Sequence, residues 1–503
     1  MSGKVVLLGA GPGEWGLLTL KGAEILKQAD CVIYDRLLNE GFLDLTPQGC
    51  EKIFVGKENH FHVIPQDEIN ELLFKKACEH KLVVRLKGGD PYVFGRGGEE
   101  ALYLIDKGIE VEVIPGISSS VAALSAAGIP ITHRGLAKGF QVITAHSRKD
   151  KATDIDYSKL TDEKITLVFL MGLAHVGEIA QGLLNVGRSS DTPVAVVSNG
   201  TTNHQKKCVG TLETIEKLVV EAELESPAII VVGEVVKLSD TLNFFEKRPL
   251  FGRKYFLPKI ESFEYSLKER KPASTNELES KLMENGAEII SIKTGKIMPK
   301  GIDLSFLSKM TENDIIAFTS ANGVKAFFYN LFEVAGKDLR AIHNCHFAVV
   351  GKKTYDTLAS FGIRADIVST KQSGKDLADV INRRVTLSSD VYWICAAKQA
   401  GGFEDNLSER FNLTKVVSYE NVPNSFTIDD SHKADIMNCD GAIFTSGSAA
   451  SISIDALGGQ LPFYIYSIGK SCSNEIRKNG FDDIIESSES SYSALVELLI
   501  ESY

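Results

Sequence analysis

Short β-rich runs alternate with helical patterns from the start of the chain, and this alternation constrains the fold more than any other feature. The runs are KVVLLGA, CVIYDR, KIFVG, LVVRLKGGD and VEVIPG. Residues 65–80 carry apolar residues at helical spacing, and a second helical pattern ends on Gly108, a residue type common after helices. The alternation predicts an α/β fold with a largely parallel sheet and helices on both faces.

The pattern changes after residue 116. Ser118 is placed to cap a helix of small residues that ends at Gly128. The runs FQVITAH, ITLVFLMG, PVAVVSNG, KKCVGTL and AIIVVGEVV then follow at closer spacing. We therefore expect a second α/β lobe with a mixed sheet that ends near Val236. Residues 238–253 have no clean period and carry charge and proline, so we place the major domain boundary there.

The second half of the chain contains a pseudo-repeat. IIAFTSANGV at 315–324 is similar to GAIFTSGSAA at 441–450. A Gly-Lys pair downstream of each opens a helical pattern that closes on glycine, at 351–362 and 469–480. Two copies of one strand–helix module predict two similar lobes. The polar residues that would then lie at strand C-termini, where α/β sheets bind ligands, are Thr319, Ser320, Thr445 and Ser446.

Bulk properties exclude several classes of protein. The 503 residues predict about three to four folding units. No apolar run reaches the roughly 18 residues that span a bilayer, and the N-terminus reads as a strand, so we expect a cytoplasmic protein. A net charge of −11 argues against non-specific binding of nucleic acid. The eight cysteines form no CxxC pair and the histidines no HExxH, so we expect reduced thiols and no metal site.

A glycine-rich loop, GAGPGEWGLL, follows the first expected strand. Gly9 and Gly11 fit the dinucleotide fingerprint G-x-G-x-x-G, but Glu14 takes the third position and the helical pattern starts only near Thr19. A pyrophosphate needs the N-terminus of a helix directly at the end of the strand, so we reject an NAD site. Two interpretations remain, a turn that binds nothing and a close-approach loop for a ligand with little phosphate, such as S-adenosylmethionine.

Two further loops follow strands in the same region. LKGGDPYVFGRGGEE at 86–100 has glycines that allow close backbone approach beside Asp90, a hydrogen-bond acceptor. VIPGISSS places Ser118 and Ser119 at the start of a helix. Each loop alone is as readily a plain connection. Because all three would lie at the C-terminal ends of one parallel sheet, we expect them to converge on one crevice.

These stretches, with YDRLL, VGK, GIPITHRG, MG, SNGT and SPAIIVVG, occur in the order in which the tetrapyrrole methylase family has them. About 245 residues closely resemble the uroporphyrinogen-III C-methyltransferases of that family. The resemblance implies a two-lobed methyltransferase, usually a homodimer, that binds S-adenosylmethionine and methylates uroporphyrinogen III to precorrin-2. The implied cofactor contacts are Pro12, Gly88, Gly89, Asp90, Val93, Ser118, Ser119, Met171, Gly200 and Ala228.

The resemblance also implies an acid/base pair, Asp35 and Lys57. Asp35 could stabilise the cationic macrocycle left by methyl transfer or accept its proton, or it could instead pair with the neighbouring Arg36. Lys57 could donate a proton, bind a substrate carboxylate, or be a solvated lysine. The basic residues expected to bind the substrate carboxylates are Arg36, Arg96, His133 and Arg134, with Arg85, Lys87 and Arg148 as further candidates for the cleft.

Residues from about 250 resemble the uroporphyrinogen-III synthase family through RPLFGR, FTSANGV, AVVGKKTYDTLASFG, VVSYENVP, FTSGSAAS and YSIGKSCSNEI. The resemblance implies two α/β lobes, at about 252–297 plus 424–503 and 298–423, joined by two crossing strands. It implies cyclisation of hydroxymethylbilane with inversion of ring D and without a cofactor. The chain departs from the family because its first strand lacks the usual threonine–arginine pair and because Cys472 replaces a common threonine.

Tyr419 matches the tyrosine that in this family assists loss of the hydroxyl group, although it could simply be a packed strand aromatic. The residues expected to bind substrate carboxylates are Thr319, Ser320, Asn322, Thr445 and Ser446. Each could instead cap its own helix.

The combined prediction is a bifunctional enzyme on a route toward sirohaem and cobalamin. Residues 1–245 would form the methyltransferase, with lobes at about 1–116 and 117–245, and residues 246–503 the synthase. The partners are expected to be tetrapyrroles and a second copy of the chain. The alternative is an active methyltransferase fused to a lapsed synthase that serves as a binding scaffold.

Overall fold

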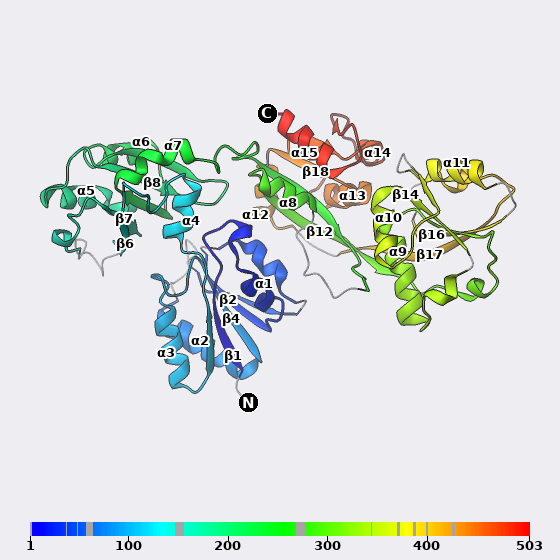
Figure 1. Ribbon diagram of the computed structural model, residues 1–503, viewed down its shortest axis with the longest axis horizontal. Helices are drawn as coiled ribbons and strands as arrows, with labels where there is room; N and C mark the ends of the chain where they lie inside the picture. Colours follow the sequence, from blue (N-terminus) through cyan, green and yellow to red (C-terminus); the bar gives the residue numbers. More distant parts are fainter. Residues whose placement is uncertain are drawn as a thin grey trace. The chain divides into compact units, whose positions relative to one another are not determined.

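The computed structural model describes residues 3–36, 38–47, 49–56, 64–145, 155–267, 277–343, 345–369, 373–385, 389–398, 401–424 and 428–503 (Figure 1). The chain forms two compact units. One comprises Met1–Gly252 with Glu284–Ala287, and the other comprises Arg253–Met283 with Glu288–Tyr503.

The first unit begins with a parallel sheet in the order β3-β2-β4-β1-β5. Its strands are β1 (Lys4–Gly9), β2 (Cys31–Tyr34), β3 (Glu51–Phe54), β4 (Leu82–Lys87) and β5 (Glu110–Ile114). Its helices are α1 (Leu20–Leu26), α2 (Gln66–Glu79) and α3 (Gly97–Asp106). The expected parallel sheet is confirmed, and Thr19 and Gly108 flank α1 and α3 as the sequence indicates.

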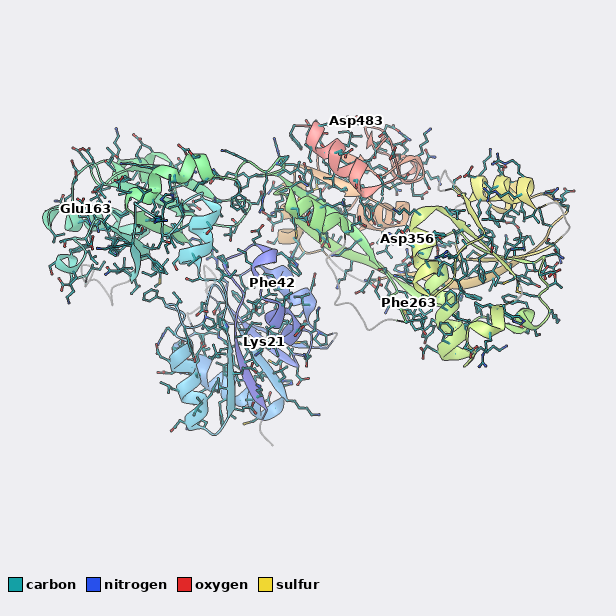
Figure 2. All side chains as sticks on the ribbon, viewed as in Figure 1. Lys21, Phe42, Glu163, Phe263, Asp356 and Asp483 are labelled. Atoms are coloured by element: carbon teal, nitrogen blue, oxygen red, sulfur yellow. The ribbon has the colours of Figure 1, made fainter. Side chains whose placement is uncertain are left out.

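Both faces of this sheet are apolar, because alternate residues of each strand point to opposite sides. On one face β1 and β4 supply Val5, Leu7 and Val83, which pack against α2 and α3. On the other face Val6, Leu8 and Val84 pack against α1 and the short helix at Glu40–Leu45. Phe42 of that short helix, labelled in Figure 2, is fully buried. Its ring contacts Trp15, with ring centroids 5.1 Å apart.

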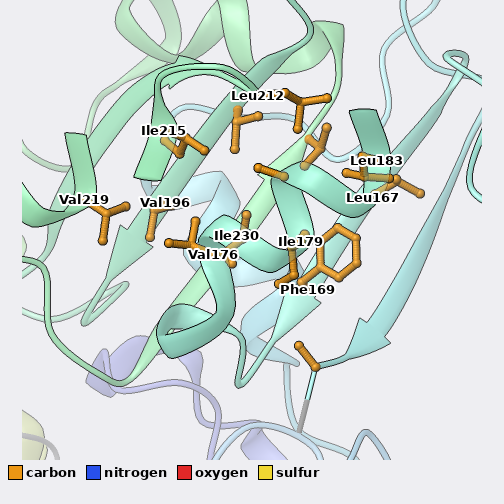
Figure 3. Packing of buried hydrophobic residues seen from close by; sticks show 14 of the residues in the cluster. Leu167, Phe169, Val176, Ile179, Leu183, Val196, Leu212, Ile215, Val219 and Ile230 are labelled. Carbon is orange, nitrogen blue, oxygen red and sulfur yellow. The ribbon is translucent and has the colours of Figure 1, made fainter. Parts of the chain in front are cut away.

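The second sheet of this unit is mixed, as expected, in the order β6-β7-β10-β8-β9, and only the β6–β7 pair is parallel. Its strands are β6 (Gly139–Thr144), β7 (Ile165–Leu170), β8 (Pro193–Ser198), β9 (Lys206–Thr211) and β10 (Ala228–Val232). The helices are α4 (Ser119–Ala126), α5 (Val176–Asn185), α6 (Ile215–Glu221) and α7 (Ser239–Leu242). Figure 3 shows the core between this sheet and α5 and α6, built from aliphatic side chains around Phe169.

The second unit is built on one ten-stranded sheet in the order β15-β14-β13-β16-β17-β12-β11-β18-β19-β20. Two long strands, β12 (Glu288–Pro299) and β17 (Asn412–Pro423), pair antiparallel from Gly295 to Pro299. They connect the two halves of the sheet, as expected for the crossing strands. The other strands outside the repeat are β11 (Lys254–Glu261), β15 (Ile367–Ser369), β16 (Asp390–Ala396) and β20 (Ile485–Glu486).

The pseudo-repeat of the sequence is a structural repeat. Its first copy is β13 (Ile315–Phe318), α9 (Ala321–Tyr329), β14 (His346–Val350) and α10 (Gly351–Ser360). Its second copy is β18 (Gly441–Phe444), α13 (Gly447–Ala456), β19 (Tyr464–Ser467) and α14 (Lys470–Lys478). The two strands of each copy pair in parallel, which confirms the prediction of two similar modules.

The remaining helices of this unit are α8 (Glu277–Glu284), α11 (Gly374–Arg384), α12 (Asp430–Met437) and α15 (Tyr492–Glu501). Within the described ranges, no helix has the length and apolar character needed to cross a membrane.

Three turns press against one another where β1, β4 and β5 end. A Cβ atom on Gly116 would lie 2.1 Å from the Gly89 carbonyl oxygen, and one on Gly9 would lie 2.4 Å from the Gly116 nitrogen. Gly11 and Gly89 also exchange backbone hydrogen bonds of 3.2 and 2.8 Å. Backbone packs directly on backbone here, so these turns have no room for side chains at the contact positions.

We predict that Gly116→Ala destabilises the first unit by about 2–3 kcal/mol, because the added methyl group must displace a backbone carbonyl. Calorimetry of the full chain should then show the melting transition of that unit lowered by about 5–10 °C. Gly98→Ala is the matched control, since among the described residues nothing apart from its chain neighbours and the backbone of its own helix lies within 4 Å of the Cβ position. Equal melting temperatures for the two variants would contradict the close packing.

Candidate active sites

The loops predicted to converge do meet at one edge of the first sheet. Asp90 is the polar link between them, because its Oδ1 accepts a hydrogen bond from the Tyr92 amide at 2.8 Å and its Oδ2 accepts one from the Gly116 amide at 3.1 Å. Pro12 follows Gly11, which is bonded to Gly89. The structure therefore gathers Pro12, Gly88, Gly89 and Asp90 in one place, with the Asp90 carboxylate already holding two loops together.

Ser118 is the N-cap of α4, and its Oγ accepts a hydrogen bond from the Ser120 amide at 3.3 Å. The capping role left open by the sequence is therefore present. Ser119 is the first residue of the helix and is half-buried. Val93 lies in the loop after Asp90 and is exposed, so its side chain is open to contact with a ligand.

The other expected cofactor residues lie together at one edge of the second sheet. Leu170 at the end of β7 pairs with Ile229, and Ser198 at the end of β8 pairs with Ala228. Met171 and Gly200 follow these strand ends, so both lie beside Ala228. Met171 has a φ of 57° and is 51% exposed, and a Cβ atom on Gly200 would lie 2.3 Å from that of Ala123 in α4.

The two sheet edges meet through Gly13. A Cβ atom there would lie 3.0 Å from Cγ2 of Thr202 and 3.4 Å from Oγ1 of Thr201. Thr201 is 3% exposed, and its Oγ1 has no hydrogen-bond partner in the described part of the chain. Sequence reasoning did not single out Thr201, although it follows Gly200 in the quoted stretch SNGT. Loops from both sheets thus border a common region.

Glu14, which disfavoured a phosphate ligand, has a defined partner. Its Oε1 forms an ion pair of 2.8 Å with Arg248, and the Arg248 guanidinium lies 4.3 Å from the centre of the Phe245 ring. The first glycine loop is therefore fixed to residues 245–248 at the end of the same unit.

Asp35, at the end of β2, is 32% exposed and accepts a 2.7 Å hydrogen bond from Nη2 of Arg85. The alternative prediction, an ion pair between Asp35 and Arg36, is wrong. Asp35 does form an ion pair, but with Arg85, because Arg36 is exposed and the register of β2 on β4 brings Arg85 to the carboxylate. The prediction that Arg85 and Lys87 are cations exposed in the substrate cleft is also wrong. Both are buried against Glu100 of α3, and burial lowers the pKa of Lys87.

The other expected substrate cations are exposed. Arg96 donates hydrogen bonds to both carboxylate oxygens of Glu99, which raise its pKa. His133 and Arg134 lie in the turn before β6, where His133 forms an isolated bridge with Ala137. Lys57 and Arg148 lie outside the described residues.

In the second unit, Tyr419 contacts the first turn of α9. Its hydroxyl lies 2.8 Å from Oγ of Ser320, which also caps α9 by accepting from the Gly323 amide at 3.0 Å. Burial raises the pKa of the Tyr419 phenol, so it keeps its proton as a donor. The structure brings Tyr419 and Ser320, two of the predicted site residues, into contact, and it shows the helix cap that was the alternative role of Ser320.

Asn421 was missed by sequence reasoning. It lies two residues from Tyr419 on the same face of β17 and donates a 3.3 Å hydrogen bond to Oγ of Ser448 in α13. Its Oδ1 has no partner among the described residues. Ser448 in turn lies 3.0 Å from Ser446. One face of β17 therefore contacts the N-terminal turns of both repeat helices. The sequence signal that could have identified Asn421 is its spacing of two residues from Tyr419, which places both side chains on one face of a strand.

The remaining expected residues have mixed surroundings. Thr319 accepts a 3.0 Å hydrogen bond from Nε1 of Trp393, while Asn322 and Thr445 are half-buried near the starts of α9 and α13. Cys472 is buried, and burial raises the pKa of its thiol to about 11. A thiol with that pKa is a packing group rather than a nucleophile.

One group of possible metal ligands lies at the opposite edge of the first sheet, where side-chain donors of Cys31, Glu51 and His80 approach within 4.8 Å of one another. The Lys76 ammonium contacts both Glu51 oxygens at 2.8 and 2.9 Å. That carboxylate is already neutralised by an internal cation, so this group does not support a metal site.

Comparisons with known proteins find two families along the chain. Residues 4–216 match Tetrapyrrole (Corrin/Porphyrin) Methylases, and residues 276–497 match Uroporphyrinogen-III synthase HemD. The chain is 39% identical to the porphyrin biosynthesis protein HemD of Ruminiclostridium josui over 82% of this chain and 80% of that protein. It is 40% identical to the uroporphyrinogen-III C-methyltransferase of Bacillus subtilis over 65% of each. It is 48% identical to siroheme synthase 2 of Yersinia enterocolitica but spans about half (51%) of its length.

We predict that Asp90→Ala weakens binding of S-adenosylmethionine, the ligand implied by sequence resemblance, by about 10- to 100-fold. The loss of two hydrogen bonds to a charged acceptor should release the loops that border the site. Isothermal titration calorimetry on the full chain measures the affinity.

Asp30→Ala is the matched control for this prediction. Oδ2 of Asp30 also accepts two backbone hydrogen bonds, from Lys81 at 3.1 Å and Leu82 at 2.9 Å, at the opposite edge of the same sheet. We expect its affinity to stay within about twofold of the unmodified chain. Equal weakening in both variants would contradict a local role for Asp90.

Proposed function

Because this chain belongs to the tetrapyrrole methylase family over its first half and to the uroporphyrinogen-III synthase family over its second, we propose that it is a bifunctional enzyme. Residues from about 1 to 245 methylate uroporphyrinogen III twice and yield precorrin-2, with S-adenosylmethionine as the methyl donor. Residues from about 246 to 503 supply that substrate by cyclising hydroxymethylbilane, without a cofactor.

The observation that supports the methyltransferase most directly is the meeting of glycine turns from two sheets. Backbone groups near Pro12, Gly89 and Gly200 border one region, and exposed Val93 and Met171 offer apolar contacts beside them. Such a border suits S-adenosylmethionine, which has an adenine ring, a carboxylate and a positively charged sulfur but no phosphate. Asp90, Ser118, Ser119 and Ala228 complete the proposed cofactor site.

The proposed reaction does not require the protein to form a covalent intermediate. The methyl group of the cofactor is already electrophilic, so the main task is to align it with a pyrrole carbon. Attack by carbon leaves a cationic macrocycle, and the Asp35 carboxylate stabilises that charge or accepts the proton. Arg36, Arg96, His133 and Arg134 bind substrate carboxylates. The role of Lys57 as the partner of Asp35 remains a proposal from resemblance.

For the synthase, the supporting observation is the buried, hydrogen-bonded phenol of Tyr419. A protonated phenol donates to the leaving hydroxyl of hydroxymethylbilane. The first turns of α9 and α13, with Ser320, Asn322, Thr319, Thr445 and Ser446, provide amide and hydroxyl donors for the substrate carboxylates. We also propose that the protein works in the cytoplasm and forms a homodimer through its first unit. Light scattering on the full chain measures the molar mass and so distinguishes a dimer from a monomer.

We predict that single substitutions separate the two activities in the full chain. With hydroxymethylbilane and S-adenosylmethionine, the unmodified chain should give a type III macrocycle with two added methyl groups, identified by mass. Tyr419→Phe should lower the synthase rate by about 100-fold, because the proton donor is lost, while supplied uroporphyrinogen III is still methylated. Asp35→Asn should do the reverse and accumulate unmethylated uroporphyrinogen III.

Two outcomes would contradict this assignment in different ways. If the unmodified chain forms only spontaneous uroporphyrinogen I but methylates supplied uroporphyrinogen III, the second half is a scaffold. If neither substrate gains methyl groups, the methyltransferase assignment is wrong.

A further inference from the structure

A charged cluster interrupts the apolar layer between the first sheet and helices α2 and α3. Near the middle of the sheet this layer is made of Val83, Leu73 and Leu104. Toward the carboxyl ends of the strands the same face of β4 carries Arg85 and Lys87, 2% and 5% exposed. Helix α3 places Glu100, fully buried, against both of them.

Arg85 is held from several sides. Its Nε donates to Glu100 at 3.2 Å, its Nη1 donates to the carbonyl oxygens of Ile33 and Leu86 at 3.3 Å each, and its Nη2 donates to Asp35 at 2.7 Å. A planar guanidinium with this many fixed contacts has a single orientation. The position of the Asp35 carboxylate is therefore tied to groups on two strands and one helix.

Glu100 is the other centre of the cluster. Its Oε1 accepts hydrogen bonds from Arg85 at 3.2 Å, Lys87 at 2.9 Å and Gln66 of α2 at 3.2 Å. Its Oε2 has no hydrogen-bond partner among the described residues. The cluster holds two cations, Arg85 and Lys87, and two carboxylates, Glu100 and Asp35, so it is electrically balanced.

This arrangement is a poor way to gain stability. Removing paired charges from water costs several kcal/mol per ion. Apolar residues of similar volume often give the fold equal or greater stability. The next turn of the same layer, toward Leu104 and Val83, is apolar. Functional sites are one place where proteins retain buried, interacting ionisable groups.

The cluster also connects Asp35 to the first glycine loops. Tyr34 of β2 pairs with Leu86 of β4, so Asp35 and Lys87 follow this pair on neighbouring strands. Lys87 directly precedes Gly88 and accepts a backbone hydrogen bond from Ala10 at 2.8 Å. A shift of Glu100 would thus move the Asp35 carboxylate and the Gly88–Gly89 turn together.

We propose that Glu100 and Arg85 are positioning residues that set the Asp35 carboxylate at a fixed place relative to the cofactor loops. This inference rests on the proposed role of Asp35 in methyl transfer. Glu100 acts on turnover only through Arg85 and Asp35, and Lys87 balances its charge while anchoring the turn that follows.

The test is a double-mutant cycle on methylation of supplied uroporphyrinogen III by the full chain. Glu100→Gln should lower kcat by about 10- to 100-fold and leave KM for S-adenosylmethionine within about twofold, as expected for a residue that orients a reactive group. In an Asp35→Asn background the same substitution should change kcat by less than about twofold. The synthase rate of the same preparation serves as the internal measure of the amount of active chain.

Two further variants serve as a substitute and as a control for this test. Arg85→Lys keeps the positive charge and loses the fork geometry, and it should reproduce the cycle if Glu100→Gln fails to fold. Glu51→Gln is the control, because it removes contacts to Lys76 and His80 at the opposite edge of the same sheet and should leave kcat unchanged.

The outcomes distinguish failure of the positioning role of Glu100 and Arg85 from failure of the proposed role of Asp35. Equal losses of kcat in the presence and absence of the Asp35 carboxylate, or no loss from Glu100→Gln and Arg85→Lys, would overturn the positioning role alone. Full turnover by Asp35→Asn would overturn the proposed role of Asp35 and the positioning inference with it.

Discussion

Direct contact of backbone on backbone at Gly9, Gly89 and Gly116 is the constraint on which the first unit depends. The turns after β1, β4 and β5 lie so close that a Cβ atom at Gly116 would fall 2.1 Å from a carbonyl oxygen. Because side chains are absent at the contact, the turns form a wall of amide and carbonyl groups. Asp90 and Gly13 extend this wall toward α4 and the second sheet. Glycine backbone can approach a ligand closely, so such a wall suits the cofactor site proposed above.

In the second unit the candidate site residues are positioned by a repeated strand–helix module and one pair of long strands. In each copy of the repeat a threonine and a serine follow the end of the strand, and the serine is the N-cap of the next helix. The proposed site for substrate carboxylates uses these two helix N-termini. The strand β17 passes both of them and presents Tyr419 to one and Asn421 to the other. The alternation of strand side chains, rather than any glycine loop, organises this site.

The local patterns of the sequence predicted most of this architecture. Hydrophobic periodicity and the positions of glycine, proline and serine predicted the strands, the start of a helix near Thr19, the cap at Ser118 and the repeat, because each of these depends on neighbouring residues. The partner of Asp35 could not be predicted in the same way, since Arg85 reaches it through the register of two strands 50 residues apart in sequence. The burial of Arg85 and Lys87 depends on Glu100 of a separate helix, and a basic residue near a glycine loop looks the same whether it faces solvent or a buried carboxylate.

The Glu14–Arg248 ion pair gives the segment between the two families' regions a structural meaning. Residues 245–248 are joined to the first glycine loop by this salt bridge, and Arg248 also contacts the ring of Phe245 within the segment. A recombination event that exchanged the second unit at residue 245 would cut away Arg248 and leave Glu14 without its cation. Exchange after Gly252 keeps the pair intact, but it replaces Glu284–Ala287, which belong to the first unit and whose Asn285 carbonyl accepts a hydrogen bond from the Leu250 amide.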